Sequence, residues 1–333
     1  MQFLETYSTD PEYNLAFEAY CFQHLPVQND SYFFLWINSP AIIIGKNQNA
    51  YAEINIDYVN KHNIKVVRRI TGGGAVYHDL GNLNFSFIEA SPDSKKIDFK
   101  KYYSYIITAF RELGLPAELS GRNDITINGK KCVGASQAIR NNRTLSNGCI
   151  LFDVKLDELA KALTVRPEKL QAKGVKSVSA RVGNLIGALN RPITIEAFKR
   201  HLLNSIFKQR GEVPHEYQLS AEELAGVKKI YDERFSLKSW NYGKSLTAQC
   251  HNYRYFPHGA IEVFFDVEKG CLQNVTILGD FFSIADLDEL EQQLIGTPYE
   301  AETLKKKFET VDLEKYFGPM RSDDITALFF DLN

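Results

Sequence analysis

The chain has 333 residues, 44% hydrophobic and 24% charged, which suits one large globular domain plus a smaller one. Its formal net charge is −2 and it has no long basic stretch, which argues against a nucleic-acid partner. The five cysteines include no pair at C-x-x-C spacing, which argues against a disulfide framework or a zinc site and predicts reduced thiols in the cytoplasm.

The N-terminal segment lacks a basic region followed by an apolar one, so we expect no signal peptide. A helix is predicted next, with Thr9 or Asp10 as its cap and Pro11 at its first position. Apolar runs such as FFLWI are strand-sized, so we expect no membrane span. The pattern predicts strands at 31–38, 41–48, 65–70 and 83–88, and a second helix at 51–63.

The middle of the chain interleaves helices and strands. Residues 98–114 form an amphipathic pattern closed by Gly114, a typical residue after a helix end. Asn128-Gly129, flanked by alternating residues, predicts a hairpin within 124–137. A strand is expected at 148–154, and helices at 156–163 and 194–209. This order favours the α+β class over a doubly wound parallel sheet.

A second unit begins within residues 240–256. Residues 259–282 predict a hairpin, and 286–294 and 300–308 predict helices. We therefore expect a catalytic domain over residues 1–245 and a small accessory domain over 250–333.

Three consecutive glycines, Gly72 to Gly74, follow a predicted strand that ends in Arg68 and Arg69. Glycines let the backbone approach a ligand closely, and their N–H groups form a concavity suited to an anion. The arginines would supply positive charge for a phosphate or carboxylate. The spacing matches neither a P-loop nor G-x-G-x-x-G. A tight turn is the alternative, but the arginines before the run and His78-Asp79 after it favour a binding site.

Lys131 lies just after the predicted turn, on a strand from which its ammonium can reach a pocket. The alternative is a solvated turn lysine, which describes its neighbour Lys130 well. Asp124 precedes the same hairpin and is a candidate Mg²⁺ ligand near phosphates, with an Asx turn as the alternative.

Two cysteines are tested as nucleophiles. Cys132 adjoins Lys131, which would lower its pKa, but neighbours on a strand point to opposite faces. If Lys131 faces the pocket, Cys132 faces the core, and Cys149 opens the apolar run CILF and is assigned to the core as well. We therefore expect no cysteine nucleophile. His78 is a candidate general base, although the sequence identifies no partner for it.

Three segments resemble signature motifs of the lipoate–protein ligase family, in a superfamily shared with biotin–protein ligases and octanoyltransferases. RRITGGGAVYHDLGN resembles RR-x-[ST]-GGGAV-[FY]-HD-x-GN, and GRNDITINGKKCVGASQ resembles GRND…[RK]K-x-x-G-[SN]-A. KGVKSVSARVGNL is similar to the adenylate-binding loop, and FDVEKG is similar to part of the accessory domain. The motifs stand in the family's order, and the likeness extends over essentially the whole chain.

The resemblance implies a large biotin/lipoate-ligase-like catalytic domain, with mixed sheets flanked by helices, and a small α+β accessory domain. It implies that ATP and lipoate condense to lipoyl-AMP, and that the lipoyl group then passes to a specific lysine of a lipoyl carrier domain, as in lipoate salvage. The carriers would be acyltransferase subunits of 2-oxoacid dehydrogenases or the glycine-cleavage H protein. Neither nucleic acid nor a membrane would take part.

Carried over position by position, the motifs also imply site residues. Lys131 would bridge the acyl carbonyl and the α-phosphate, and so stabilise charge in both half-reactions. Arg69 would contact a nucleotide phosphate, and Gly134 would let the backbone approach the acyl group. The loop from Lys173 to Arg181 would close over the adenylate and shield it from water. The other implied ligand-binding positions are Gly73, Gly74, Ala75, Val76, Tyr77 and Asn147, and Asp124 would neighbour Mg²⁺.

One departure from the family leaves alternatives open. Where HHGT or HHGC is usual, this chain has Ser146-Asn147-Gly148-Cys149, so two imidazoles near the expected acyl site are lost. One alternative is a lipoyl or octanoyl transferase that moves the group between carrier proteins, although its expected cysteine is absent from AELSGRNDI. The other is a non-catalytic lipoate-binding paralogue, against which the retained Arg69, glycine run and Lys131 argue.

Overall fold

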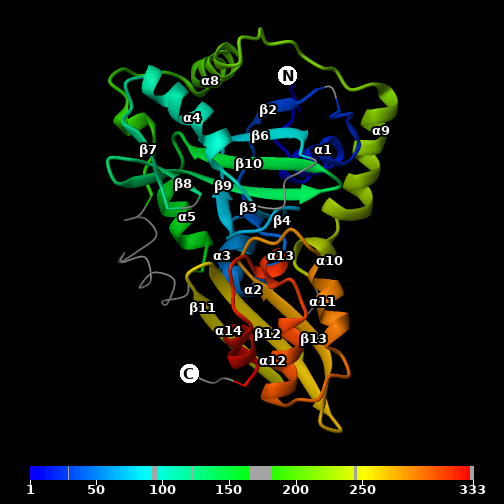
Figure 1. Ribbon diagram of the computed structural model, residues 1–333. Helices are drawn as coiled ribbons and strands as arrows, with labels where there is room; N and C mark the ends of the chain where they lie inside the picture. The colour runs from blue at the N-terminus through cyan, green and yellow to red at the C-terminus, as the bar shows by residue number, and fades with distance from the viewer. Residues whose placement is uncertain (29, 92–96, 122, 165–181, 244–245, 331–333) are drawn as a thin grey trace.

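Figure 1 shows a computed structural model of the chain, in which residues 1–28, 30–91, 97–121, 123–164, 182–243 and 246–330 are described. A larger α+β body carries the N-terminus at its top, and a smaller body, coloured yellow to red, lies beneath it. The predicted α+β class with a large mixed sheet is confirmed.

The larger body is built on a seven-stranded sheet. Its first two strands are parallel and all other neighbours are antiparallel. In spatial order the strands are β1 (Gln2–Leu4), β2 (Tyr32–Trp36), β6 (Asn82–Ala90), β10 (Arg143–Leu151), β9 (Lys130–Arg140), β8 (Asp124–Ile127) and β7 (Ala117–Ser120).

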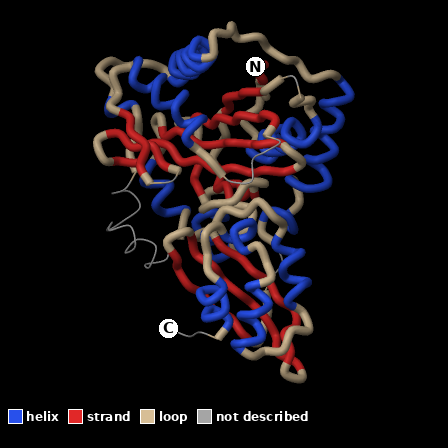
Figure 2. Tube along the Cα trace, in the orientation of Figure 1, coloured by secondary structure: helices blue, strands red, loops and turns tan. Residues whose placement is uncertain are grey.

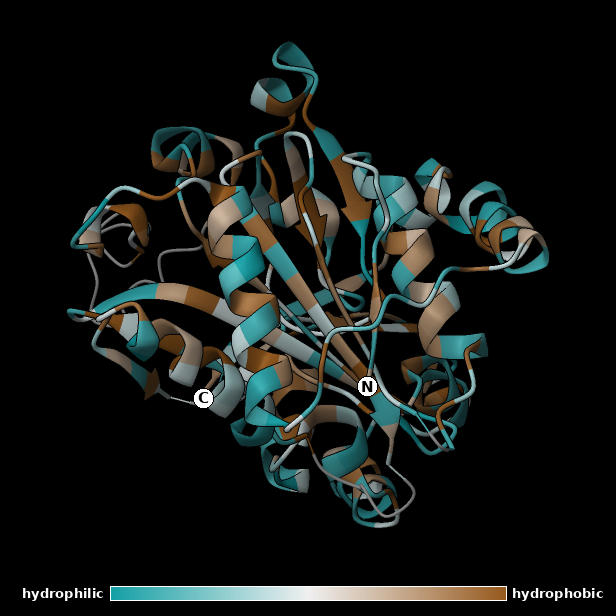
Figure 3. Cartoon of the chain, turned by 90° about the horizontal axis from the view of Figure 1, so that it is seen from above, coloured by the Kyte–Doolittle hydropathy of each residue, from teal (hydrophilic) through white to brown (hydrophobic). Residues whose placement is uncertain are grey.

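Helices cover both faces of this sheet. One apolar core lies between the sheet and helices α4 (Lys100–Glu112) and α8 (Ile195–Gln209). A second core on the other face includes α1 (Pro11–His24), with α9 (Ala221–Ile230) packed outside it. Figure 3 shows hydrophobic residues concentrated along the central strands.

A small mixed sheet packs on the α1 side of the large sheet. It consists of β4 (Lys65–Arg68), β3 (Ala41–Ile44) and β5 (Val76–His78), with β3 central. Short helices α2 (Ala50–Glu53), α3 (Ile56–Lys61) and α5 (Leu156–Ala162) lie around a further core on its outer side. The space between the two sheets positions the candidate site.

The smaller body is an antiparallel sheet of β11 (Cys250–Phe256), β12 (Gly259–Glu268) and β13 (Cys271–Gly279), with helices packed on one face (Figure 2). These helices are α11 (Leu287–Leu294), α12 (Ala301–Glu309), α13 (Leu313–Phe317) and α14 (Ser322–Phe329). Elsewhere the chain forms the 3-10 helix η1 (Ile186–Ala188), the π-helix η2 (Tyr231–Phe235) and α10 (Lys238–Asn241).

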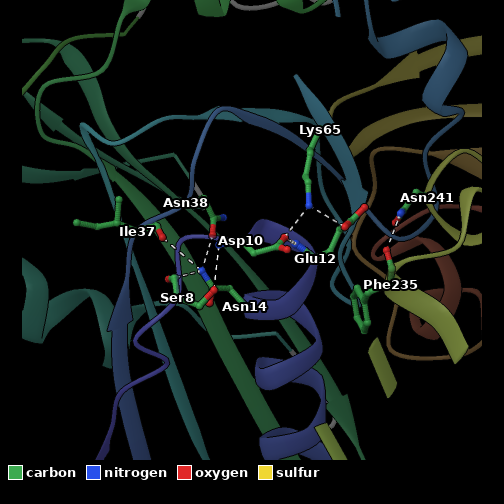
Figure 4. Close-up of polar contacts among 9 residues, drawn as sticks. All are labelled: Ser8, Asp10, Glu12, Asn14, Ile37, Asn38, Lys65, Phe235 and Asn241. Carbon is green, nitrogen blue, oxygen red and sulfur yellow. Dashed lines mark hydrogen bonds and ion pairs between the residues drawn. The ribbon is translucent and has the colours of Figure 1, made fainter. Parts of the chain in front are cut away.

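Local signals in the sequence predicted several of these elements correctly. The Asp10 carboxylate caps α1 by accepting from the Glu12 amide (Figure 4). Pro11 occupies the first turn of this helix. Gly114 follows α4 at a φ of +78°. The hairpin turn has φ of +50° at Asn128 and +76° at Gly129, as a type I′ turn requires.

Two predicted elements differ in the structure. The helix expected over 51–63 is two helices, because Ile54 forms a β-bridge with Leu163 and the Asn55 side chain caps the second helix. The strand expected from residue 148 begins at Arg143, so that Ser146 and Asn147 lie inside it. Pairing with β6 and β9 over its whole length explains the earlier start.

Contacts between the two bodies are specific. The Gly279 amide donates to the Asn47 carbonyl at 2.8 Å, and the Asp286 carboxylate pairs with both Lys46 and Arg140. Phe282 packs edge-on against Phe99 of the larger body, with ring centroids 5.6 Å apart. Among the described residues, no helix is long and apolar enough to cross a membrane.

Candidate functional site

A cavity of about 630 Å³ lies between the two sheets of the larger body, and the smaller body contributes to its lining. Residues from β3, β5 and the glycine run line one side, and residues of the large sheet line the other. The predicted site residues that line it are Arg69, Gly73, Gly74, Ala75, Val76, Asp124, Lys131, Gly134 and Asn147.

One row of cross-strand partners runs across the large sheet beneath this cavity. Successive strands place one residue each in the row, and all five residues line the cavity. In order from β2 to β8 they are Trp36, Asn84, Cys149, Gly134 and Asp124. A ligand lying along this row would cross the strands.

Lys131 lies at the Asp124 end of the row. Its Nζ is 2.7 Å from Asp124 Oδ1. The ammonium also rests against Gly134, because a Cβ added there would lie only 2.8 Å from Nζ. Val182 and Gly183 run beside Lys131, whose carbonyl accepts from the Gly183 amide at 3.0 Å. The hairpin therefore brings a cation, a carboxylate and a glycine together at one end of the cavity.

Arg69 is buried at the base of the glycine run. Its Nη2 donates to the carbonyls of Gly72 and Gly74, its Nη1 to Ile43, and its Nε to the Thr71 hydroxyl. Burial lowers its pKa to about 10, so the guanidinium remains charged at neutral pH. Arg69 thus shapes the glycine run and adds a positive field to the cavity.

Arg68, in contrast, stabilises the fold through hydrogen bonds to backbone carbonyls. Its guanidinium donates to the carbonyls of Gly45, Lys46 and Gln48, and to that of Trp240. It does not line the cavity. The expectation that both arginines serve a ligand is therefore corrected for Arg68.

The glycine run needs its glycines for close packing. Gly73 has a φ of +89°, and its amide donates to the Phe281 carbonyl at 3.3 Å. A Cβ at Gly72 would lie 2.8 Å from that same carbonyl, and one at Gly45 would lie 1.9 Å from the Gly73 oxygen. The smaller body therefore packs directly on the run.

A directional chain of hydrogen bonds leads from Arg69 to the buried carboxyl of Glu18. Ser136 donates its hydroxyl proton to Asn147 Oδ1 at 2.6 Å, so Thr71 is the donor in its 2.7 Å contact with Ser136. Asn147 Nδ2 then donates to Glu18 Oε1 at 2.9 Å. Burial raises the pKa of Glu18 to about 7. Asn147, which stands where the family pattern has histidine, is thus held by the large sheet, the loop that contains Thr71, and α1.

His78 lines the cavity and is not suited to general base catalysis. Its Nδ1 lies 3.0 Å from Asn38 Nδ2. Burial, assisted by the charge of Arg69, lowers its pKa to about 3. The imidazole is therefore neutral at physiological pH and too weakly basic to abstract a proton, which corrects the expected role.

The cysteines divide between core and cavity. Cys132 lies in the α4 and α8 core, as the strand alternation predicted, and burial raises its pKa to about 11. Cys149 is buried, as predicted, and it also lines the cavity, which the sequence did not indicate. Burial also raises the pKa of Cys149, so neither thiol is activated as a nucleophile.

Of the implied positions that the structure describes, Tyr77 does not line the cavity. Tyr77 points into the outer core of the small sheet, because its neighbours Val76 and His78 take the cavity face. The expectation that Tyr77 lines the site is therefore corrected. Lys173 and Arg181 lie outside the described residues.

The donor set for Mg²⁺ is small. Among the residues that the structure describes, no group of three His, Cys, Asp or Glu side chains gathers as a metal cage. Asp124 is a single carboxylate that already pairs with Lys131. Such a site suits Mg²⁺ only when phosphate oxygens supply further ligands, and Mg²⁺ is usually coordinated in this way.

Several lining residues were not found from the sequence. Leu15 belongs to α1, as does Glu18, which lies behind the lining and bonds to Asn147. The smaller body contributes lining that no local pattern indicated. The further lining residues include Trp36, Ile43, Asn84, Tyr255, His258, Asp280 and Phe282.

The chain matches two known protein-family models. Residues 10–207 match the model of the lipoyl protein ligase A/B catalytic domain, and residues 245–329 match that of the bacterial lipoate protein ligase C-terminus. The chain is 42% identical over 323 residues to lipoate-protein ligase LplJ of Bacillus subtilis, covering 96% of this chain and 97% of that one. It is 40% identical over 321 residues to lipoate–protein ligase 1 of Staphylococcus aureus, with the same shares covered.

Solved structures give the same result. LipL1 of P. falciparum in complex with lipoate matches with a TM-score of 0.80 and 27% identity, over 93% of this chain and 94% of that one. A lipoate-protein ligase A bound with ATP matches with a TM-score of 0.63 and 26% identity, over 73% and 98%. The bipartite ligase of Thermoplasma acidophilum, described with its E2 lipoyl domain, matches with a TM-score of 0.65 and 27% identity, over 75% and 98%.

Proposed function

Because this chain belongs to the lipoate–protein ligase family, we propose that the cavity between its two sheets performs both half-reactions, with Lys131 as the catalytic residue. ATP-dependent attachment of lipoate to protein is the activity of the family and of this chain. The observation that carries the site assignment is the cluster of Lys131, Asp124 and Gly134 at one end of the cavity.

We place the carboxylate of lipoate beside Lys131 and Gly134. The ammonium is the cavity cation nearest the row, and Gly134 leaves room beside it. The acyl chain then extends along the row over Cys149 and Asn84 toward Trp36. Leu15, Ile43 and Val76 are the apolar side chains that enclose its far end.

In the first half-reaction, a carboxylate oxygen of lipoate attacks the α-phosphorus of ATP, and the bond to pyrophosphate breaks. Negative charge accumulates on the oxygens of the α-phosphate as its bond to the carboxylate forms. In this placement the α-phosphate and the carboxylate both lie next to Lys131. A fixed ammonium stabilises that charge and requires no rearrangement of water. Arg69 adds its positive field from the glycine run, although most of its N–H groups are used within the fold.

In the second half-reaction, a carrier lysine amine attacks the acyl carbon of lipoyl-AMP, AMP leaves, and the amine loses its surplus proton. Lys131 again stabilises the oxygen that becomes negative. A mixed phosphoric anhydride is an activated leaving group, so this scheme needs no protein nucleophile. The raised pKa values of the two cysteines agree with such a mechanism.

We propose that Mg²⁺ enters with ATP and that Asp124 is its carboxylate neighbour, where the ion would neutralise phosphate charge. We also retain the division into a catalytic domain over 1–245 and an accessory domain over 250–333. The apolar core of the smaller body, formed entirely by residues after 250, supports this boundary.

The acceptors in this proposal are lipoyl carrier domains. The Thermoplasma relative is described with an E2 lipoyl domain. We extend this to acyltransferase subunits of 2-oxoacid dehydrogenases and the glycine-cleavage H protein. Reaction in the cytoplasm would supply ATP and keep the five free thiols reduced.

The overall activity is tested by lipoate-dependent exchange of labelled pyrophosphate into ATP. Purified protein should catalyse exchange only when lipoate is present. Transfer between carrier proteins without ATP, together with no exchange, would establish the transferase alternative instead.

The role of Lys131 is tested with the same assay and with transfer from preformed lipoyl-AMP. Lys131→Ala should slow both half-reactions by about 100-fold or more, since it removes the charge that both share. Lys130→Ala is the matched control, because its side chain is exposed next to Lys131 in the chain. Near-normal rates for Lys131→Ala in both assays would disprove the assignment.

A further inference from the structure

We propose that Tyr103 is a positioning residue, which acts on the reaction through Lys131. Its hydroxyl group holds the β8–β9 hairpin in the register that points the Lys131 ammonium into the cavity. This inference rests on the proposed role of Lys131. Tyr103 lies in the core behind the sheet and does not line the cavity, so we assign it no contact with a ligand.

A β-bulge in β9 brings Lys131 and Gly134 to the same face of the sheet. In a regular strand, residues three positions apart point to opposite faces. Here the pairing with β8 skips Cys132, so one extra residue stands between Lys131 and Val133. Cys132 and Val133 both point into the α4 and α8 core, whereas Lys131 and Gly134 both line the cavity. The direction of the Lys131 side chain therefore depends on where the bulge lies.

Two anchors set the register of the hairpin, one on each side of the bulge. The first is the turn at Asn128-Gly129. The second is Asn123, whose carbonyl accepts from the Ala135 amide at 3.1 Å and whose Nδ2 donates to the Ala135 carbonyl at 2.9 Å. A shift of one residue between these anchors would turn Lys131 away from the cavity.

Tyr103 adds a further hydrogen bond to the second anchor. It belongs to α4, which packs beside β7 at this end of the sheet (Figure 1). Its hydroxyl donates to the Asn123 carbonyl. The side chain is 1% exposed, and burial raises the pKa of the phenol well above its ordinary value. The hydroxyl therefore keeps its proton and remains a donor.

The bond from Tyr103 distinguishes the observed register from a slipped one. Asn123 immediately precedes Asp124, which pairs with Gly134 and forms the 2.7 Å ion pair with Lys131. A slipped hairpin would move the Asn123 carbonyl away from the hydroxyl, because α4 is held by its own packing in the core. The hydrogen bond therefore favours the register in which Asp124 faces Lys131.

Removal of the Tyr103 hydroxyl should leave the fold intact. In Tyr103→Phe the Asn123 carbonyl keeps the Ala135 amide as a donor, so no buried acceptor is left unpaired. The aromatic ring also keeps its place against Phe99, whose ring centroid lies 6.0 Å away. The variant therefore tests the position of the hairpin rather than folding of the chain.

The experiment measures pyrophosphate exchange by full-length Tyr103→Phe. One neutral hydrogen bond is lost, so kcat should fall about fivefold. The KM for lipoate should stay within about twofold, because a misplaced ammonium weakens stabilisation of the transition state more than it weakens ligand binding. In a Lys131→Ala background the same substitution should have no further effect, since the two residues act in one pathway.

Tyr102→Phe is the matched control. Tyr102 is the adjacent residue of α4 and is also buried, but its hydroxyl donates to Glu89 Oε1 at 2.6 Å. Its substitution should leave kcat within about twofold of the unmodified protein. Amide hydrogen exchange, followed by NMR, adds a measurement that needs no turnover. The Ala135 amide should exchange about fivefold faster in Tyr103→Phe and at an unchanged rate in Tyr102→Phe.

An unchanged kcat or an unchanged exchange rate of the Ala135 amide in Tyr103→Phe would overturn the inference. So would an equal loss of kcat in Tyr102→Phe. A fivefold loss that persists in the Lys131→Ala background would show that Tyr103 does not act through Lys131. In each of these cases Lys131→Ala by itself would still be slow, and the proposed function would stand. A fully active Lys131→Ala would contradict the proposed function, and the inference with it.

Discussion

Glu18 is the buried carboxyl at which the polar side of the cavity ends. Its Oε1 accepts from Ser86 and Asn147, and Asn147 in turn fixes the hydroxyl of Ser136. Only Asn147 and Ser136 of this group line the cavity, and Glu18 lies behind them. Asn147, which stands where the family pattern has histidine, is thus fixed by hydrogen bonds to Glu18 and Ser136.

The pKa of Glu18 makes folding stability depend on pH. Burial raises it to about 7 in the folded protein, above the ordinary value of 4.5 that unfolding restores. Below pH 4.5 both states keep the proton. As pH rises from 4.5 to 7 the unfolded chain loses the proton first, so stability falls, and the full cost is present above pH 7.

We therefore expect Glu18→Gln to be less sensitive to pH than the unmodified protein. Its stability relative to the unmodified protein should rise by about 3 kcal/mol between pH 5 and pH 8. The measurement is urea unfolding at both pH values. Glu222→Gln, at an exposed position of α9, is the control. Equal pH slopes for Glu18→Gln and the unmodified protein would refute the assignment.

At the scale of elements, the β8–β9 hairpin forms the end of the cavity at which we propose that the chemistry takes place. Its turn sets the register in which Lys131 pairs with Thr126, and a bulge follows before Asp124 pairs with Gly134. Alternation along β9 then sends Cys132 to the opposite core. A short and locally encoded element therefore carries much of the proposed chemistry.

The turn residue Gly129 has a backbone conformation that favours glycine. Gly129 has a φ of +76°, and a Cβ added there would meet no atom within 4 Å. Gly129→Ala should therefore cost about 1 kcal/mol of folding stability through backbone strain alone. Urea unfolding with an unchanged m-value measures this cost.

Gly187→Ala controls for the substitution as such. A Cβ at Gly187 also meets no atom within 4 Å, but its φ is not in the left-handed region. Its stability should stay within about 0.5 kcal/mol of the unmodified protein. Equal effects at the two glycines would show that backbone strain is not the cause.

At the scale of the whole molecule, the smaller body forms part of the lining of the cavity. The Phe281 carbonyl accepts from the Gly73 amide, and Phe282 reaches the core that contains Phe99. The carboxylate of Asp286 joins the two bodies by ion pairs. Contact between the bodies and the shape of the cavity are therefore coupled.

Phe282→Ala should uncouple the two bodies. Removing a buried phenyl ring costs about 3–5 kcal/mol, and here much of that packing lies across the interface. Differential scanning calorimetry should resolve two unfolding transitions in the variant and fewer in the unmodified protein. Phe264→Ala is the control, since its ring stacks on His251 within the smaller body. A single, unshifted transition for Phe282→Ala would contradict this coupling.

The sequence by itself determined the features that depend on near neighbours. The cap of α1, the turn at Asn128-Gly129 and the opposite directions of Lys131 and Cys132 were all predicted, because each is set within a few residues. The ordered motifs likewise identified the family. Such signals need no knowledge of which strands become neighbours.

Only the tertiary structure decided which distant residues meet. Glu18 bonds to Asn147 across 129 positions, Cys149 faces the cavity, and Tyr77 does not. These outcomes depend on the register of β10 between β6 and β9, and on the sheet to which β5 belongs. A shift of one residue turns every side chain of a strand to its other face, and strand pairing sets that register.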